Sequence, residues 1–172
     1  MTLRRFASAA LLLTTAVGTA GWAGLRVNTT HSIPPGVYWL TDLPVTPGDT
    51  VLACPPELPV IAEAFQRGYI GVGFCPGGYE YLFKRALAAK NDVVSIEPSG
   101  VSVNGSSIPN TAQMSADPAG RRLPIYSKIG FRLSENDVLL ISNYSPRSFD
   151  GRYFGPVDSS LIRGVVIPLV TW

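Results

Sequence analysis

The residues best suited to chemistry lie directly after the only long apolar run, in the stretch NTTHSIPPGVYW (28–39). This stretch contains the only histidine, His31, beside a candidate nucleophile, Ser32. In a Ser-His-Asp site the imidazole must reach the serine oxygen. Consecutive side chains of an extended chain point to opposite faces, so His31 is poorly placed to serve Ser32. If Ser32 is a nucleophile, we expect a different proton acceptor.

A buried lysine is the remaining acceptor of sufficient basicity, because burial among apolar groups lowers its pKa from about 10.4 toward about 7–8. The chain has three lysines, Lys84, Lys90 and Lys128. Only Lys84 lies in an apolar, strand-like run, YLFKRALA, where its neighbour Arg85 would face the opposite way. Taken alone, a strand lysine is more often an edge residue facing water, and a loop serine more often a cap or turn residue.

The composition argues against several other kinds of site. One histidine and two cysteines are too few for a typical zinc site, so we expect no metal and no cofactor. The glycine-rich run GYIGVGF (68–74) lacks the strand-to-helix context of a phosphate-binding loop. The net charge is +2, without a basic run longer than a doublet, so no nucleic-acid partner is expected.

The first 25 residues are expected to direct the chain to a membrane. Two arginines precede an uncharged, apolar span (6–25), and Arg26 ends it. A span of this length just crosses a hydrocarbon core of about 30 Å, while the small residues near its end suit an export cleavage site. The segment 1–25 is therefore a cleaved signal peptide or a retained anchor, with a buried core helix as the remaining alternative. In the first two cases residues 26–172 are exported as one domain.

The two cysteines, Cys54 and Cys75, are expected to form a disulfide. An even count in an exported chain favours pairing. Closing a loop of this size stabilises the fold by roughly 3 kcal/mol in the chain-entropy model. A catalytic thiol is the alternative, but it would need a histidine, and the only one lies next to Ser32.

The remainder of the chain has the pattern of short strands separated by turns, consistent with its 17 glycines and 15 prolines. Strands are expected at 36–41, 49–54, 79–88, 92–97, 137–142 and 165–170, the last two apolar enough to be buried. The pair Asn104-Gly105 predicts a hairpin within 101–108, whereas 110–132 has little pattern and is expected to be loop.

A short surface helix is expected between the two cysteines. Leu58, Ile61, Ala62 and Phe65 recur there at helical spacing. The sequence therefore predicts a mainly β domain of short antiparallel strands with few short helices, preceded by an N-terminal apolar helix.

Several short motifs occur in the order found in the signal peptidase I family of Ser/Lys proteases. Ser32-Ile33-Pro34 resembles its membrane-proximal Ser-x-Pro, and Lys84-Arg85 resembles its strand Lys-Arg. The stretches NDVV (91–94) and VSVNG (101–105) resemble its GD-x-V turn and VNG hairpin. SFDGRYFG (148–155) is similar to its S-x-D-S-R-Y-x-G box, which is the most specific of these motifs.

This resemblance covers about residues 24–172 and implies a signal-peptidase-like β fold and a serine endopeptidase activity. Ser32 would be the nucleophile, and neutral Lys84 would accept its proton. The oxyanion would be held by the Ser32 backbone N–H and the Thr30 hydroxyl, because residues i and i−2 share a face in extended chain.

The resemblance also assigns roles to the final box. Ser148 would hydrogen-bond Lys84 and aim it. Asp150, paired with Arg152, would hold the loop or act on Lys84 directly as an ionisable partner. An ordinary loop that contains an ion pair is the alternative for Ser148, Asp150 and Arg152.

Within the family, the sequence is most similar to peptidases of plasmid conjugative transfer, on PPGVYWL, the two-cysteine insert and SFDGRYFGPV. This similarity implies a pilin precursor as the substrate, which is hydrolysed or cyclised. It further implies a periplasmic location facing the inner membrane, with other mating-pair-formation proteins as partners.

Two departures from the general enzyme favour a narrow substrate: Ser142-Asn143-Tyr144 replaces a GDN triplet, and Ile33 replaces a methionine. Two alternatives remain open. One is a general signal peptidase that removes leader peptides from many proteins. The other is a non-catalytic component of a mating channel, in which Lys84 merely snorkels at a membrane-facing rim.

Overall fold

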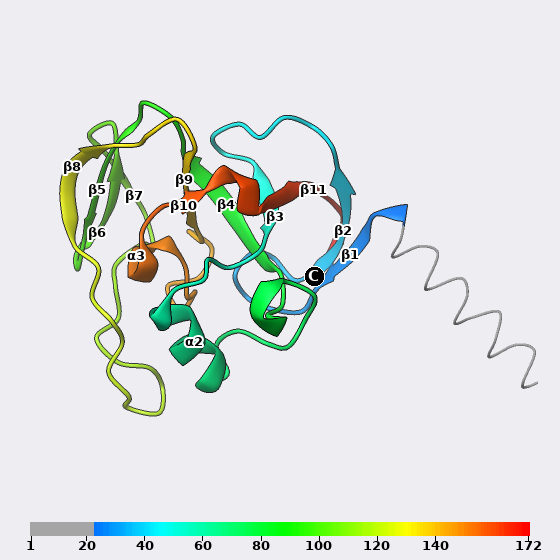
Figure 1. The fold of residues 1–172 in the computed structure, drawn as a ribbon, viewed down its shortest axis with the longest axis horizontal. Helices are drawn as coiled ribbons and strands as arrows, with labels where there is room; N and C mark the ends of the chain where they lie inside the picture. The colour runs from blue at the N-terminus through cyan, green and yellow to red at the C-terminus, as the bar shows by residue number, and fades with distance from the viewer. Residues whose placement is uncertain (1–22) are drawn as a thin grey trace, which may run out of the picture.

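The computed structural model describes residues 23–172, which form two antiparallel sheets and a few short helices (Figure 1). The expected signal peptide or anchor (1–25) lies outside the described residues, except for its last three. Leu25, at the end of that segment, already begins the first strand. Between residues 23 and 172, no helix combines the length and apolar character needed to cross a membrane.

The larger sheet has seven strands in the order β1-β2-β11-β3-β4-β9-β10, with every neighbouring pair antiparallel. Its strands are β1 (Leu25–Asn28), β2 (Gly36–Thr41), β3 (Thr50–Ala53), β4 (Leu82–Ala88), β9 (Asp137–Ile141), β10 (Val157–Asp158) and β11 (Ile162–Thr171). Non-consecutive strands are therefore neighbours, which brings distant parts of the sequence together.

The smaller sheet has the order β7-β6-β5-β8 and lies beside β9 and β4 (Figure 1). Its strands are β5 (Val93–Glu97), β6 (Gly100–Val103), β7 (Ser106–Ile108) and β8 (Lys128–Arg132). The helical segments are α2 (Pro59–Gln66), α3 (Gly151–Phe154), and the 3-10 turns η1 (Pro76–Gly78) and η2 (Ser159–Leu161). The predicted mainly β class is confirmed.

Strand β9 joins the two halves of the molecule because both of its faces are buried. Leu140 belongs to the main core, which lies between the larger sheet and α2. Leu139 and Ile141, pointing the other way, belong to the core shared with the smaller sheet. This two-sided burial explains the continuous apolar run DVLLI and confirms the expected buried strand.

A third cluster lies beneath the segment that carries Ser32. Its buried members are Ile33, Tyr38, Leu52, Phe83 and Val166, which come from the β1–β2 connection and from β2, β3, β4 and β11. Four strands of the larger sheet thus form the support on which the candidate nucleophile is mounted.

The expected hairpin and helix are both present. Asn104 and Gly105 have positive φ values of 50° and 81° and join β6 to β7, as a type I′ turn requires. Helix α2 forms within the stretch of helical spacing and buries Ile61 and Ala64 against the main core.

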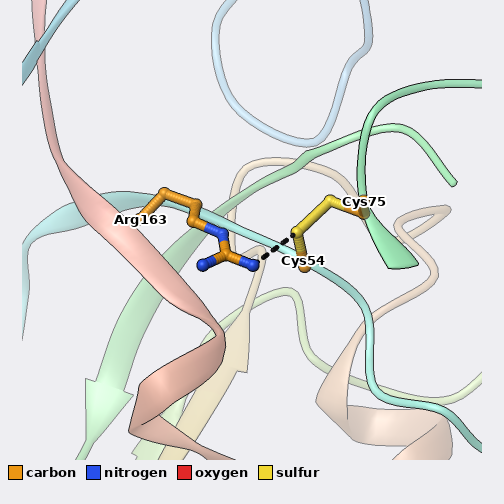
Figure 2. Close-up of a disulfide and its surroundings, with 3 residues drawn as sticks. All are labelled: Cys54, Cys75 and Arg163. Carbon is orange, nitrogen blue, oxygen red and sulfur yellow. Dashed lines mark hydrogen bonds between the residues drawn. A yellow bond between two sulfur atoms is a disulfide. The ribbon is translucent and has the colours of Figure 1, made fainter.

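The predicted disulfide is confirmed (Figure 2). Cys54 directly follows β3, and Cys75 directly precedes η1; both are buried, with their Cα atoms 5.5 Å apart. Arg163 on β11 donates a hydrogen bond to Cys54 Sγ at 3.5 Å. The bridge closes the insertion that contains α2 and holds both of its ends beside the larger sheet.

Two expectations were wrong in part. The segment expected to be loop (110–132) ends in β8, an exposed strand held by backbone pairing with β5 and by the Gly130 N–H donating to Ser95 Oγ at 2.9 Å. Such a strand depends on its partner and leaves little local pattern. In the last expected strand, Val165 and Val166 are buried, but residues 167–170 are exposed on both sides of the strand.

The 3-10 turns η1 and η2 were not predicted from the sequence, and neither were three further elements. They are β1, the short helix α3 and the two-residue strand β10. The expected strand at 79–88 begins only at Leu82. Each of these elements is too short to show a periodicity of its own. Strands β1 and β10 are held by pairing with neighbouring strands, and α3 is capped by Asp150.

Candidate active site

Ser32 lies in a bend between β1 and β2 that is fixed on its C-terminal side. Ile33 is 3% exposed and packs into the cluster beneath the bend. The hydroxyl of buried Tyr38 donates to the Pro34 carbonyl at 2.6 Å. The residues that follow Ser32 are thus anchored to the sheet, while Ser32 itself remains partly exposed.

Lys84 lies on the same face of β4 as Leu82 and Ala86, two members of the main core, and is only 2% exposed. Its Nζ donates to Ser32 Oγ at 2.7 Å and to Ser148 Oγ at 2.8 Å. Ser148 Oγ is itself 3.4 Å from Ser32 Oγ. Three residues separated by 52 and 64 positions therefore meet in one hydrogen-bonded group.

The environment of Lys84 makes it a usable base. Burial lowers the pKa of Lys84 from 10.5 to about 8, because an ammonium group loses hydration in the interior. The charges of Asp150 and Glu80 raise this pKa, and the charge of Arg152 lowers it, but burial dominates. At neutral pH, Lys84 is then uncharged and able to accept a proton in about one molecule in ten.

The side chain of His31 lies at the surface, whereas that of Lys84 is buried. The exposed side chain of His31 lines the cavity beside Ser32, whereas the hydrogen-bond partner of Ser32 Oγ is the ammonium nitrogen of Lys84. The geometry agrees with the sequence argument that neighbouring residues 31 and 32 do not form a hydroxyl–imidazole pair.

Asp150 and Arg152 form a buried ion pair with 0% exposure of both side chains, and Arg152 Nε lies 2.8 Å from Asp150 Oδ1. Asp150 also caps α3 by accepting from the Arg152 N–H, and its Oδ2 accepts from the Ser142 N–H at 2.9 Å. Because each oxygen has a donor, the buried carboxylate is paired and not left as an isolated charge.

Arg152 extends this network to the loops around the site. Its guanidinium donates to the carbonyls of Asn110, Ala112, Pro146 and Ser142. The loop that carries Ser148 is thereby tied to α3 and to the chain after β7. The charge of Asp150 raises the pKa of Lys84, and its carboxylate accepts from the backbone of Ser142 and Arg152.

The Ser142-Asn143-Tyr144 departure from the family triplet has a structural explanation. Ser142 meets the buried pair through its backbone: its N–H donates to Asp150, and its carbonyl accepts from Arg152. Because the backbone makes these two contacts, they do not depend on which side chain occupies the position.

The backbone between Thr30 and Ser32 does not have the extended geometry that was expected from the sequence. Residues 30–33 are bent, and the Ser32 N–H points at Thr30 Oγ1 over 3.5 Å. The Thr30 hydroxyl donates to Asn28 Oδ1 at 2.8 Å. The two groups expected to bind an oxyanion thus contact each other, through a bond at the weak limit of distance.

A cavity of about 560 Å³ opens beside Ser32 and Lys84. Most of its lining is apolar or aromatic and includes Tyr69, Leu82, Met114, Leu123, Phe149 and Tyr153. Its outer wall is held by Asp117, which accepts from the Tyr69 hydroxyl and from Arg121. These contacts lower the pKa of Asp117 to about 2, and the hydrogen bond from Tyr69 makes the largest contribution.

Several of these residues had not been singled out from the sequence. Asn28 and Tyr69 belong to no motif, and their contacts depend on segments far along the chain or on a bend that periodicity does not reveal. Among residues 23–172, no group of three or more histidine, cysteine, aspartate or glutamate side chains is placed to hold a metal ion.

Comparison with known proteins places the chain in a family. The description "Signal peptidase, peptidase S26" matches residues 2–172, and the chain belongs to that family. A plasmid transfer protein TraF of Escherichia coli is 52% identical over 96% of this chain and 92% of its own. A probable conjugal transfer protein TraF of Sinorhizobium fredii is 38% identical, over 91% and 84%.

Among solved structures, a signal peptidase I from Enterococcus faecalis is 16% identical, with a TM-score of 0.42, covering 74% of this chain and 100% of that one. The TraF relatives identify the chain as a homologue of conjugal transfer proteins that has a signal-peptidase-like domain.

Proposed function

We propose that this chain is a serine endopeptidase in which Ser32 attacks a peptide carbonyl and Lys84 acts as general base. The observation that carries the proposal is the 2.7 Å contact between Lys84 Nζ and Ser32 Oγ, made by a lysine that is 2% exposed. An ordinary surface lysine is charged and solvated, and would have neither the pKa nor the fixed position that this chemistry needs.

The reaction follows from these positions. Neutral Lys84 takes the proton of Ser32 as Oγ bonds to the scissile carbonyl carbon, and the resulting ammonium gives that proton to the leaving amine. The product of this half is an ester between Ser32 and the acyl part of the substrate. Ser148 keeps Lys84 in line by accepting a second hydrogen bond from Nζ.

The developing oxyanion is assigned to the Ser32 N–H and the Thr30 hydroxyl. Both have partners in this structure, but the Ser32 N–H bond to Thr30 is long at 3.5 Å and is easily exchanged for a charged oxygen. Oxyanion contacts of this kind are stronger than the neutral contacts they replace.

The proposed substrate is a pilin precursor of a conjugative transfer system. The TraF relatives are named for plasmid and conjugal transfer, and the cavity beside Ser32 is apolar enough to accept hydrophobic side chains of a peptide. If water resolves the acyl-enzyme the product is linear, and if the amino terminus of the same pilin resolves it the product is cyclic.

A periplasmic location next to the inner membrane is part of this proposal. An apolar face covers β1, β2 and β11, where Val27, Trp39, Ile167, Val170 and Trp172 are 38–69% exposed. A surface of this character is typical of contact with lipid or another protein. It lies on the two strands that flank the Ser32 bend, so a membrane-held pilin would reach the site directly.

The burial of Lys84 and the range of substrates separate the two alternatives from the proposed enzyme. A non-catalytic channel component with a snorkelling Lys84 is disfavoured by the burial of that side chain. A general signal peptidase would act on many leader peptides, so substrate range separates it from the proposed enzyme.

The deciding experiment is mass spectrometry of the plasmid's own pilin, produced with wild type, Ser32→Ala, Lys84→Ala or the double variant. Each single variant should abolish processing, and the double variant should be no worse, because the residues act as a unit. A cyclic pilin should weigh about 18 Da less than the linear chain of the same residues, since an amine has replaced water. Normal processing by Lys84→Ala would remove the Ser/Lys mechanism.

A further inference from the structure

Asn28, the last residue of β1, is a buried polar side chain with 1% exposure that the mechanism above does not use. Its Nδ2 donates to the carbonyls of Thr30, Ile33 and Pro34 at 3.0, 3.1 and 3.2 Å. Its Oδ1 accepts from the Thr30 N–H at 3.1 Å and from the Thr30 hydroxyl at 2.8 Å. One carboxamide therefore contacts the chain on both sides of Ser32.

These five contacts use the whole hydrogen-bonding capacity of the side chain. A carboxamide has two N–H donors and one oxygen with two lone pairs, so three carbonyls share the donors and two Thr30 groups fill the acceptor. The Ser32 bend consequently closes around Asn28 and not around a backbone ladder. No other residue type of this size offers two N–H donors together with a carbonyl acceptor.

We propose that Asn28 is the positioning residue of the nucleophile: it sets the bend that presents Ser32 to Lys84 and fixes the rotation of the Thr30 hydroxyl. This inference rests on the proposed peptidase function. With its hydrogen directed to Asn28 Oδ1, the Thr30 oxygen presents a lone pair to the Ser32 N–H.

The same arrangement lets the Thr30 hydroxyl exchange its hydrogen bond to Asn28 for one to the developing oxyanion. When the Thr30 hydroxyl rotates toward a developing oxyanion, Asn28 Oδ1 keeps its bond from the Thr30 N–H. The buried oxygen is therefore never left without a donor, and the cost of exposing the hydroxyl to the reacting carbonyl stays small.

The test is Asn28→Asp, which keeps the size and acceptor but removes both donors and places a charge against three carbonyl oxygens. Thr111→Val is the matched control: Thr111 is also 1% exposed and joins the Val101 N–H to the Ile108 carbonyl, in the smaller sheet. Both variants lose buried hydrogen bonds, but only one of them touches the bend.

We expect Asn28→Asp to lower kcat for cleavage of the pilin precursor about 100-fold, with KM little changed, because a displacement of about 1 Å is enough for such a loss. Thr111→Val should lower the melting temperature but leave kcat unchanged when assayed below the transition. If Asn28→Asp does not fold, Asn28→Ser, which keeps one donor, should lower kcat about tenfold.

Amide hydrogen exchange supplies a readout that needs no substrate. In Asn28→Asp or Asn28→Ser, exchange in the peptide covering residues 29–34 should accelerate at least about tenfold, the factor for one lost hydrogen bond. Thr111→Val should leave that peptide unchanged. Unaltered exchange at 29–34, or an unaltered kcat in a variant that exchanges faster, would overturn the inference. A wild type that processes no pilin refutes the proposed function instead, and the exchange result still decides whether Asn28 sets the bend.

Discussion

The burial of Lys84 lowers the stability of the folded protein. Its pKa of about 8 in the folded state, against 10.5 in the open chain, corresponds to about 3 kcal/mol of lost stability at neutral pH. Ser32 and Ser148 accept two of its hydrogen bonds, so the group is held in place although it is desolvated. A buried lysine at such cost is characteristic of a functional site.

The rate of processing should follow the protonation of Lys84. Because only the neutral amine accepts the Ser32 proton, kcat/KM should rise about tenfold per pH unit below a midpoint near the pKa of about 8 and level off above it. Initial rates between pH 6 and 9.5 measure the profile. Glu80→Gln removes a charge that raises this pKa and should move the midpoint to lower pH, whereas Glu97→Gln should not. A flat profile would contradict the role of Lys84.

The cost of the buried lysine can be measured directly with Lys84→Met. Between the folded pKa of about 8 and the unfolded value of 10.5, the wild-type unfolded state binds the extra proton, so wild-type stability rises with pH. The variant lacks this slope and should be more stable at pH 7, by an amount that shrinks toward pH 10.5. Urea denaturation at both pH values tests the expectation. Lys90→Met, at an exposed position paired with Glu135, is the control and should change little.

At the scale of elements, the insertion between β3 and β4 builds one wall of the cavity. It contains α2 and Tyr69, whose hydroxyl reaches Asp117 in the long loop before β8. The Cys54–Cys75 bridge closes the insertion at its base. The wall is therefore held by the disulfide at its base and by polar contacts from Arg67 and Tyr69 to the loop before β8.

Removing the bridge should destabilise the whole domain. Cys54→Ala combined with Cys75→Ala should lower the free energy of unfolding by about 3 kcal/mol, because the unfolded chain regains the freedom of a 21-residue loop. Urea titration of the double variant against oxidised wild type gives the difference. Thiol labelling of native wild-type protein should find no reactive cysteine; two labelled thiols, or equal stability of the two proteins, would refute the expectation.

At the scale of the whole molecule, the apolar face and the cavity are adjacent. The bend that carries Ser32 connects β1 to β2, and these strands with β11 form the exposed apolar face. Trp39 pairs with Leu25 on one side and Ile167 on the other, so apolar side chains line up across three strands. A peptide leaving a lipid surface would meet Ser32 at the edge of this face.

A charge on that face should impair processing of a membrane-held precursor only. Val170→Asp, at a position 62% exposed, should slow cleavage of precursor in lipid vesicles but leave cleavage of a soluble peptide from the same precursor unchanged. Ile129→Asp, 67% exposed on β8 in the smaller sheet, is the matched control and should affect neither. Equal effects of the two variants would count against the proposed orientation.

The sequence by itself determined the features that depend on local pattern or on counting. The Asn104-Gly105 turn, helix α2 and the buried strand β9 follow from residue types a few positions apart. The Cys54–Cys75 pair follows from a count of two. The residue types and the family motifs together predicted Ser32 and Lys84 as the reacting pair.

Only the tertiary structure decided whether those residues meet. Lys84 reaches Ser32 across 52 positions because β2, β11, β3 and β4 are neighbours in one sheet, an order that no local pattern encodes. The lowered pKa of Lys84 depends in the same way on burial by distant segments, whereas the five contacts of Asn28 are local and depend on a bend that periodicity does not reveal. Strand β8 likewise exists only beside β5. Pairing and burial are properties of the folded chain, since the energy of each contact depends on which segment supplies the partner.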